Sequence, residues 1–362
     1  MVRTARVLLT VMLMFMIMGC SGATDGGSGE QNEDRNASAP AVPTAVAFLN
    51  ESHGWVGAAD GIWHTQDGGQ NWTLQFPSQE PVIRLGFLDP QNGWALTGSA
   101  ALLRTENGGE DWSAAETPGA ALRAVDFVGP AHVVATDGNG LLVSRDGGKT
   151  WDRTSSPLPF SDLDFVSAEE GWAAGEGQIW HTRDGGTTWS AQLTLPEPDK
   201  WLGHTFVRFT SESSGWVLFC LGQGAGSQET YLLYSTTDAG RTWTPRLIGR
   251  WPWPFAEPAP EAPHGPGGHP VALGAWAETA WVAVYSPAGG HLEVARVTMG
   301  GAPPVVSDKI PVGGPAKPTA GLSFVDPKTG WLVVSDSQRT QGAILRTADG
   351  GQFWTAVLGN LE

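Results

Sequence analysis

The sequence predicts an all-β fold, a seven-bladed β-propeller of four-stranded antiparallel blades. An eight-residue pattern of hydroxyl residue, any residue, Asp, Gly, Gly, two variable residues and Trp occurs six times in 362 residues. The first five closing tryptophans are separated by 40, 39, 38 and 54 residues, a period typical of propeller blades. The last gap, 111 residues from Trp243 to Trp354, fits two units. Six units with a box and one without it make seven blades.

Each position of this box has a structural role. The Asp carboxylate is expected to accept hydrogen bonds from backbone N–H groups one and two residues further on, closing a turn. The glycine pair supplies positive φ, and the Trp fills the gap between neighbouring sheets. Asn107 replaces Asp in the second box, and Ala239 and Phe353 are further departures from the pattern. The box residues assigned to this structural role are Asp67, Asn107, Asp146, Asp184, Asp238 and Asp349.

Alternating apolar residues and turn residues divide each unit into four strands. In blade four the expected strands are 163–166, 171–175, 178–182 and 189–193. Blades one, three, five and seven begin near Ala45, Leu122, Thr205 and Gly321, respectively. In blade three, His132-Val133 replaces the usual Gly-Trp. Blade six is degenerate, because Met299-Gly-Gly-Ala-Pro-Pro304 replaces its box. The domain opens on an inner strand and ends on an outer one, so side-chain packing between blades one and seven is expected to close the ring.

The N-terminus has the pattern of an export signal. Arg3 and Arg6 precede an apolar run over 7–18 that is short for a membrane span and ends in Gly19-Cys20. This ending resembles the cleavage site of bacterial lipoproteins, whose cysteine carries lipid; an ordinary secretory signal or an uncleaved anchor is the alternative. The expected organisation is a signal peptide over 1–19, a flexible Gly/Ser-rich tether over 20–43 and the propeller over 44–362.

Charge limits the partners. The formal net charge is −16, and it becomes −18 without the two signal arginines. Such an acidic protein is not expected to bind nucleic acid, and its contact with a membrane is expected only through the lipid anchor. We expect an exported monomer on the outer face of a bacterial cell membrane, or on its periplasmic side. Cys220, within an apolar strand, is expected to be a buried, inert thiol.

The repeat resembles the BNR or Asp-box repeat. Its longer unit, Phe followed by Gly-Trp-Ala, then Thr-x-Asp-Gly-Gly-x-Thr-Trp, is similar to the photosystem II stability and assembly factor family, which has bacterial lipoprotein members. The resemblance covers about residues 44–359 and implies a seven-bladed, non-enzymatic scaffold. Those factors are associated with an arginine cluster on one face. Here Arg84, Arg123 and Arg208 lie in or before inner strands without an evident shared register.

Enzymatic function is the competing hypothesis, as a carbohydrate-binding or sialidase- or xyloglucanase-like propeller. A sialidase site needs three arginines, a Tyr–Glu pair and an acid, whereas this chain has three tyrosines and no Arg-Ile-Pro motif before the first blade. Asp60, Glu176 and Asp336 lie near turns and are expected to be solvated. No catalytic residue, cofactor or metal site is predicted, since the histidines lack metal-ligand spacing; His264 and His269 lie in a Pro/Gly loop.

The predicted function is therefore binding of a protein or peptide, on one particular face. In a propeller, the turns between second and third strands and the blade-to-blade connections emerge together. The long insertions at 196–203, 221–229, 250–270 and 336–342 are all of these two types. Loops on a rigid scaffold often carry binding function. The candidate anchors are Trp201, Arg250, Trp251, Trp253 and Arg339, with tryptophans packed against the propeller as the alternative.

Overall fold

The structure is a computed structural model, and it confirms the predicted fold class. It describes residues 39–115, 122, 124–137, 139–154, 160–201, 203–222, 228–249, 259–312, 317–336, 338 and 340–359. Cys20, the signal, most of the tether, and Arg123, Arg250, Trp251, Trp253 and Arg339 lie outside these ranges. No helix in the described part of the chain is long and apolar enough to cross a membrane.

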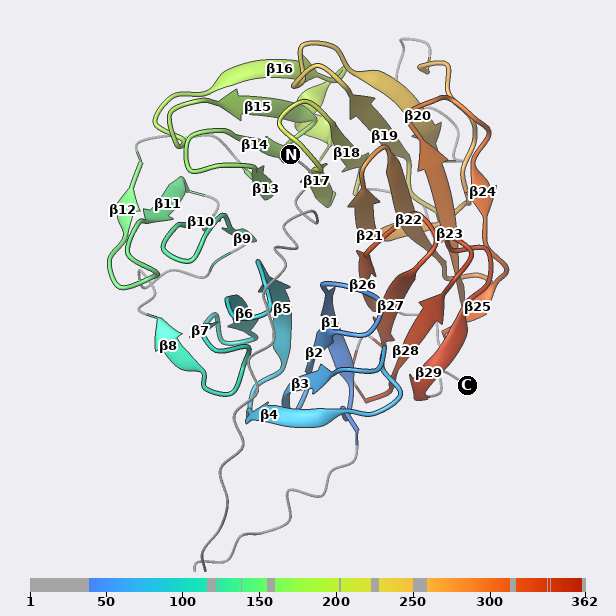
Figure 1. Cartoon of the computed structure of the whole chain (residues 1–362). Helices are drawn as coiled ribbons and strands as arrows, with labels where there is room; N and C mark the ends of the chain where they lie inside the picture. The colour runs from blue at the N-terminus through green and yellow to red at the C-terminus, as the bar shows by residue number, and fades with distance from the viewer. Residues whose placement is uncertain are drawn as a thin grey trace, which may run out of the picture.

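Seven antiparallel sheets surround a central axis, each with its first strand innermost (Figure 1). Blades one to three consist of β1 (Pro43–Phe48), β2 (Gly54–Ala58), β3 (Gly61–Thr65) and β4 (Thr73–Pro77); β5 (Val82–Phe87), β6 (Gly93–Thr97), β7 (Leu102–Thr105) and β8 (Ser113–Ala115); and β9 (Ala124–Phe127), β10 (Val133–Thr136), β11 (Leu141–Ser144) and β12 (Asp152–Arg153).

Blades four and five are formed by β13 (Asp162–Phe165), β14 (Gly171–Gly175), β15 (Gln178–Thr182) and β16 (Ser190–Thr194), and by β17 (Thr205–Phe209), β18 (Gly215–Cys220), β19 (Tyr231–Thr236) and β20 (Thr244–Ile248). One short 3-10 helix, η1 (Pro198–Lys200), lies between them. The expected strands of blade four are matched within one residue.

Blades six and seven complete the ring, with β21 (His269–Trp276), β22 (Thr279–Ser286), β23 (His291–Thr298), β24 (Val305–Val306) and β25 (Ile310–Pro311), then β26 (Thr319–Phe324), β27 (Gly330–Ser335), β28 (Gly342–Thr347) and β29 (Thr355–Gly359). The outer edge of blade six is divided, because β24 and β25 pair separately with β23. This division is the structural form of the predicted degeneracy.

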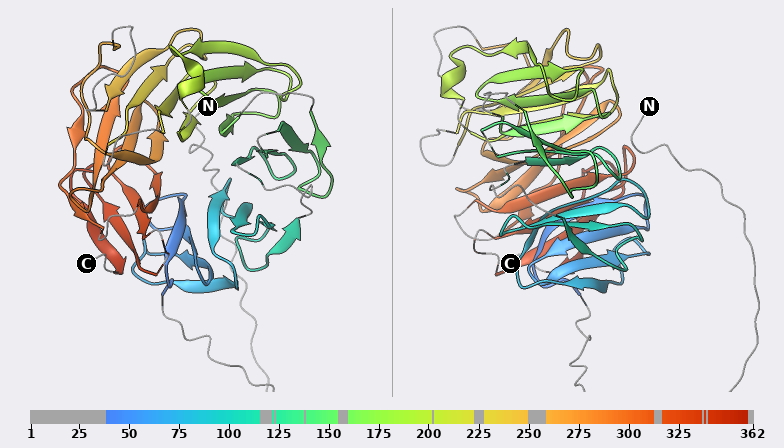
Figure 2. Two further views of the ribbon diagram at one scale, coloured as in Figure 1. Left: turned by 180° about the vertical axis from the view of Figure 1, so that it is seen from behind. Right: turned by 90° about the vertical axis from the view of Figure 1, so that its left-hand side faces the viewer.

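The two faces of the ring carry different loops, as expected. On the face that we call the connection face, Ser78 N–H of a blade-to-blade connection donates to the carbonyl of Asp60 in a second-to-third-strand turn, at 3.0 Å. On the opposite box face, Gly68 N–H of the first box donates to the carbonyl of Ser52 in a first-to-second-strand loop, at 2.9 Å. Figure 2 shows the ring from behind and from the side, with the blades arranged around the axis between these faces.

A repeated aromatic column joins neighbouring blades. Trp172 of β14 stacks on Phe209 at the end of the next inner strand, with ring centroids 3.5 Å apart, and the box Trp243 meets that Phe edge-on at 6.1 Å. Trp55, Phe87 and Trp112 repeat the arrangement between blades one and two. Stacked and edge-to-face pairs are the favourable aromatic geometries. The box Trp therefore supports the inner Phe, which packs on the preceding blade.

The same column closes the ring. Trp331 of blade seven stacks on Phe48 of blade one at 3.6 Å, and Trp331 Nε1 donates to the carbonyl of Gly68 at 3.1 Å. The backbone N–H of Phe48 also donates to Ser323 Oγ at 3.0 Å. Since β1–β4 and β26–β29 form separate sheets, no strand is shared between the ends of the domain. Closure by packing of blades one and seven is confirmed.

Blade three corrects the expected register by one residue. Phe127 pairs with Val133, whereas Phe48, Phe87 and Phe165 pair with the Gly of Gly-Trp. Val133-Val134, rather than His132-Val133, therefore occupies the Gly-Trp position. His132 was predicted to lie in the strand because two adjacent apolar residues do not show by themselves which of them faces the neighbouring blade.

Candidate functional site

The Asp boxes are hydrogen-bonded turns with both glycines at positive φ. In the fourth box, Thr182 Oγ1 donates to Asp184 Oδ1 at 2.8 Å and accepts from the buried N–H of Gly186 at 2.9 Å. The Asp184 carboxylate accepts from Thr188 N–H and Thr188 Oγ1 at 2.8 and 2.6 Å. The expectation that the carboxylate serves N–H groups one and two residues on is wrong. It reaches four residues on, because the positive φ of Gly185 and Gly186 (68° and 86°) curls the loop around it.

The other boxes repeat this geometry. Their opening Thr or Ser donates to Asp67, Asn107, Asp146, Asp238 and Asp349 at 2.8–3.0 Å. Hydrogen bonds from Asn71 and from Thr150 lower the pKa values of Asp67 and Asp146, respectively, to about 2. Ala239 keeps the positive φ (61°) of the glycine that it replaces. The aspartates among these box residues are ionised acceptors that hold their turns, and an ionised carboxylate cannot act as a general acid.

Charged side chains from four inner strands meet near the axis. This axial cluster consists of Arg84, Asp126, Asp162, Asp164 and Arg208, from β5, β9, β13 and β17. Asp162 Oδ2 accepts from Arg208 Nη1 at 2.7 Å. The Asp162 side chain is 6% exposed, whereas Arg208 retains 32% exposure to solvent, which screens the pair.

The carboxylates of this cluster are bound to backbone. Asp164 Oδ2 accepts from Phe209 N–H at 2.6 Å, and Asp126 Oδ2 accepts from Phe165 N–H at 2.5 Å. Asp162 Oδ2 also accepts from Val207 N–H at 3.1 Å. An inner strand has one unpaired edge, so its buried N–H groups need such acceptors. The cluster thus joins adjacent blades.

Electrostatics within the cluster follow from burial and proximity. Burial lowers the pKa of Arg84, nearby Arg208 lowers it further, and Asp162 opposes the shift. Burial would also lower the pKa of Arg208, but Asp162 and Asp164 raise it above the usual value. Towards the connection face, burial and the charge of Lys317 lower the pKa of His204. Both guanidinium groups remain charged, and His204 is neutral near pH 7.

The axial cluster was not predicted from the sequence. Asp126, Asp164 and Arg208 each immediately precede the last Phe of an inner strand, while Arg84 and Asp162 lie three residues before theirs. Alignment of the blades on that Phe would have revealed the shared positions. The arginines alone showed no common position, because Arg84 and Arg208 lie at different distances from the last Phe of their strands. Only the fold brings both close to Asp162.

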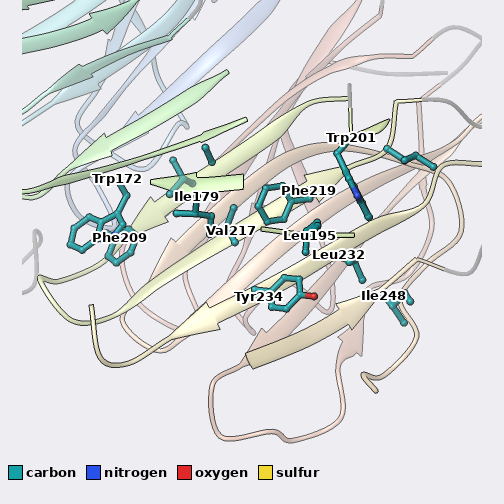
Figure 3. Packing of buried hydrophobic residues seen from close by; sticks show 13 residues of the cluster. Trp172, Ile179, Leu195, Trp201, Phe209, Val217, Phe219, Leu232, Tyr234 and Ile248 are labelled. Atoms are coloured by element: carbon teal, nitrogen blue, oxygen red, sulfur yellow. The ribbon is translucent and has the colours of Figure 1, made fainter. Parts of the chain in front are cut away.

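Among the candidate anchors, only Trp201 lies within the described residues. Its side chain is fully buried, at 0% exposure, and Nε1 donates to the carbonyl of Pro196 at 3.0 Å. It lies in the same buried cluster as Phe219 and Leu195, between blades four and five (Figure 3). Trp201 therefore matches the alternative expectation, a Trp packed against the propeller, and we do not propose it as an anchor.

A matched pair of polar contacts distinguishes blades one and four. In blade four, His181 stacks on Trp172 at 4.6 Å and its Nε2 lies 3.0 Å from Glu170 Oε1. In blade one, His64 stacks on Trp55 at 4.9 Å, but its Nε2 lies 3.0 Å from Nε2 of a second histidine, His53. Burial, reinforced by His53, lowers the pKa of His64 to about 4. No three His, Cys, Asp or Glu side chains gather at a metal-binding distance in the described part of the chain.

A groove lies at the outer edge between blades six and seven. It has a volume of about 280 Å³ and is lined by Ile310, Leu345, Phe353 and Trp354, among others. Phe353 is 63% exposed and stands where the other boxes have a polar residue. The groove follows from the interrupted outer strand of blade six.

The fold and the boxes define the class of protein, a seven-bladed propeller built from Asp-box repeats. The resemblance to the photosystem II assembly factors is confirmed, since a family model described as Photosynthesis system II assembly factor YCF48 matches residues 73–159. The chain is 28% identical over 183 residues to Photosystem II assembly protein Ycf48 of Synechococcus sp. (strain JA-2-3B'a(2-13)), covering 48% of this chain and 51% of that protein. It is 31% identical over 133 residues to Photosystem II assembly lipoprotein Ycf48 of Synechococcus sp. (strain RCC307), covering 33% and 40%. The chain thus spans about half the length, or less, of these relatives.

Solved structures support the fold. The structure described as YCF48 bound to D1 peptide superposes with a TM-score of 0.55 at 18% identity, over 86% of this chain and 95% of the other. The GH74 xyloglucanase of Xanthomonas campestris superposes with a TM-score of 0.60 at 14% identity, over 87% of this chain and 53% of the other. At these identities the likeness concerns the propeller and not its ligand.

Proposed function

We propose that this protein is a non-enzymatic, membrane-tethered propeller that binds a protein or peptide segment, as a scaffold like the photosystem II assembly factors. The observation that carries the proposal is the structural role of the box and axial aspartates in the described part of the chain. Box aspartates hold their turns, and the axial aspartates Asp126, Asp162 and Asp164 accept backbone N–H groups. Carboxylates that already hold turns and neighbouring strands are less suited to acid–base catalysis, which favours binding over hydrolysis.

The proposed binding surface is the connection face over blades four to seven. The insertions at 196–203, 221–229, 250–270 and 336–342 belong to loop types that emerge there. The second half of the longest insertion is anchored to blade five, because Ile248 N–H donates to the carbonyl of Pro263 at 3.0 Å and Tyr231 Oη donates to the carbonyl of Pro266 at 2.7 Å. Since YCF48 has been solved with a D1 peptide, a peptide segment is the partner that we propose.

Binding of a synthetic D1 peptide to the full-length protein, measured by fluorescence anisotropy, tests this proposal. We expect Trp251→Ala, Trp253→Ala and Arg339→Ala to weaken binding, since aromatic and Arg side chains commonly anchor such interfaces. Lys149→Glu, a change at an exposed variable position of the third box, is the control on the box face and should leave binding unchanged. If binding survives all three substitutions and is lost in Lys149→Glu, the site lies on the box face and the proposal is wrong.

We further propose that Cys20 is the lipidated N-terminus and that residues 20–43 tether the propeller to the outer face of the membrane. The short apolar run ending in Gly19-Cys20 supports this, and some relatives are named lipoproteins. Cys20→Ala should release the protein from membranes or block its processing. A Cys20→Ala protein that is still trimmed at residue 20 and still sediments with membranes would contradict the proposal.

A further inference from the structure

The His53–His64 pair is the one place where the described residues bring two imidazole nitrogens into direct contact. His53 immediately precedes β2 and His64 lies on β3, next to the box face. Their Nε2 atoms are 3.0 Å apart. Trp55 packs against both rings, with centroid distances of 4.7 and 4.9 Å, and so limits their positions. Both rings are partly exposed and accessible to solvent.

We propose that His53 and His64 form a two-histidine site for a divalent transition-metal ion, with Nε2 of each ring as ligand. Bonds of about 2.0–2.1 Å from imidazole nitrogen to a metal place two adjacent ligands about 2.8–3.4 Å apart, whether the geometry is square or tetrahedral. The observed separation lies in that range. Binding requires the ring that now donates from Nε2 to carry its proton on Nδ1 instead, with no net change in charge.

The comparison with blade four supports a role for the second histidine. There the same Trp–His stack places Nε2 of His181 against Glu170, a partner that a histidine can satisfy by one hydrogen bond. Blade one keeps the stack and replaces the carboxylate with a second nitrogen. An imidazole pair is a weaker hydrogen-bonding arrangement than an imidazole with a carboxylate, so packing alone does not explain the replacement.

The chemistry of the pair selects the ion. Imidazole nitrogen suits Cu²⁺, Ni²⁺ and Zn²⁺, whereas Mg²⁺ and Ca²⁺ require oxygen ligands. Both imidazoles bind metal in their neutral form. Because the described residues supply two ligands, water completes the coordination, and Cu²⁺ should bind most tightly in the usual order of affinities.

Isothermal titration of the full-length protein with Cu²⁺, and separately with Zn²⁺, tests the site. We expect one Cu²⁺ per chain, with affinity reduced by at least about tenfold in His53→Gln and in His64→Gln, the loss that even an outer-shell partner of a ligating histidine can cause. His181→Gln, the matched change in blade four, should leave the affinity unchanged. Absence of binding by the unaltered protein, or binding that both His53→Gln and His64→Gln retain, would overturn the proposal.

Two further variants guard against effects of misfolding. His53→Glu recreates the blade-four pair, so it should fold, and electron paramagnetic resonance of bound Cu²⁺ should show one imidazole nitrogen where the unaltered protein shows two. Glu170→His places a second histidine beside His181 and should raise the stoichiometry from one Cu²⁺ to two. An unchanged nitrogen count in His53→Glu, or a stoichiometry of one in Glu170→His, would contradict the geometric argument.

Discussion

The junction between blades seven and one and the junction between blades five and six solve the same packing problem differently. At the first, Trp331 stacks on Phe48 and donates Nε1–H to the box carbonyl of Gly68. At the second, blade six has neither the box nor the Phe. Its Ala275 pairs with Ala280, where blade three pairs Phe with Val and the remaining blades pair Phe with Gly. Trp216 is fully buried there, yet its Nε1 has no hydrogen-bond partner among the described residues.

Blade six compensates with longer strands and with one polar contact near each face. Its three inner strands have eight residues each. His269 Nδ1 lies 3.1 Å from the buried carboxylate of Glu229 in blade five, and Thr210 Oγ1 donates to the carbonyl of Ala277 at 2.9 Å. The box and the aromatic column are therefore one of two ways to join blades, and the ring closure, which shares no strand, depends on the first.

The largest effect should follow removal of the closing tryptophan. Trp331→Ala should lower the free energy of unfolding by about 3–5 kcal/mol, because it leaves a cavity and removes the stack that joins the ends of the domain. Losses in repeat proteins spread to neighbouring units, so hydrogen exchange should rise in blades one and seven together. Trp216→Ala is the matched change. Equal melting temperatures for the two variants, with exchange confined to one blade, would show that the column does not close the ring.

A smaller effect should separate the two polar residues of a box. Thr182 Oγ1 is the acceptor for the buried N–H of Gly186, whereas the Asp184 carboxylate serves exposed groups of Thr188. Thr182→Val keeps the shape and leaves that N–H unpaired, so it should cost about 1–3 kcal/mol in denaturant unfolding. Asp184→Asn should cost less, since Asn107 holds the second box in the same way. A larger loss in Asp184→Asn would reverse this assignment.

The repeat made most of the fold predictable, because six copies of one turn fix the strands on either side. The strands of blade four were predicted to within one residue. Closure by packing was predicted because the domain begins with an inner strand and ends with an outer one. The box geometry was not predicted correctly, since the pattern names the hydrogen-bonding residues without showing how two positive φ angles curl the loop. His132 was placed one residue out for a similar reason, as Val133-Val134 lacks the Trp that marks register.

The candidate site was less predictable than the fold. Tryptophans in insertions look alike in sequence whether they bind a partner or pack, and Trp201 proved to be fully buried. The axial cluster combines residues from β5, β9, β13 and β17, so its contacts depend on ring geometry. The pairing of His53 with His64 needed only a comparison of blades one and four, where Glu170 and His181 occupy the matching positions.

A conservative pair of substitutions sharpens the comparison of the two junctions. Trp331→Phe keeps an aromatic ring but leaves the carbonyl of Gly68 without its donor, whereas Trp216→Phe removes an N–H that has no described partner. Both variants lose similar ring volume. Trp331→Phe should therefore be less stable than Trp216→Phe by about 0.5–1.5 kcal/mol, the usual net value of one hydrogen bond, measured by urea unfolding. Identical midpoints would mean that this hydrogen bond contributes nothing to closure.

The smallest effect concerns acid. Hydrogen bonds, first from Asn71, lower the pKa of Asp67 from 3.8 to about 2 in the folded protein. A carboxylate with a lowered folded pKa stabilises the fold above its unfolded pKa, and this contribution is lost as pH falls through the folded value. The box in blade one should therefore weaken between about pH 4 and pH 2, while the junction of blades five and six, which has no box carboxylate on its blade-six side, should be less sensitive. Asp67 is partly exposed, so solvent screening keeps the effect small. Hydrogen exchange by mass spectrometry at pH 4 and pH 2.5, corrected for intrinsic rates, should show β3 and β4 losing protection before β22 and β23.

Asp67→Asn, which does not titrate, should remove that difference in blade one. Simultaneous loss in both blades, unchanged by Asp67→Asn, would mean that acid acts on the ring elsewhere than at the boxes.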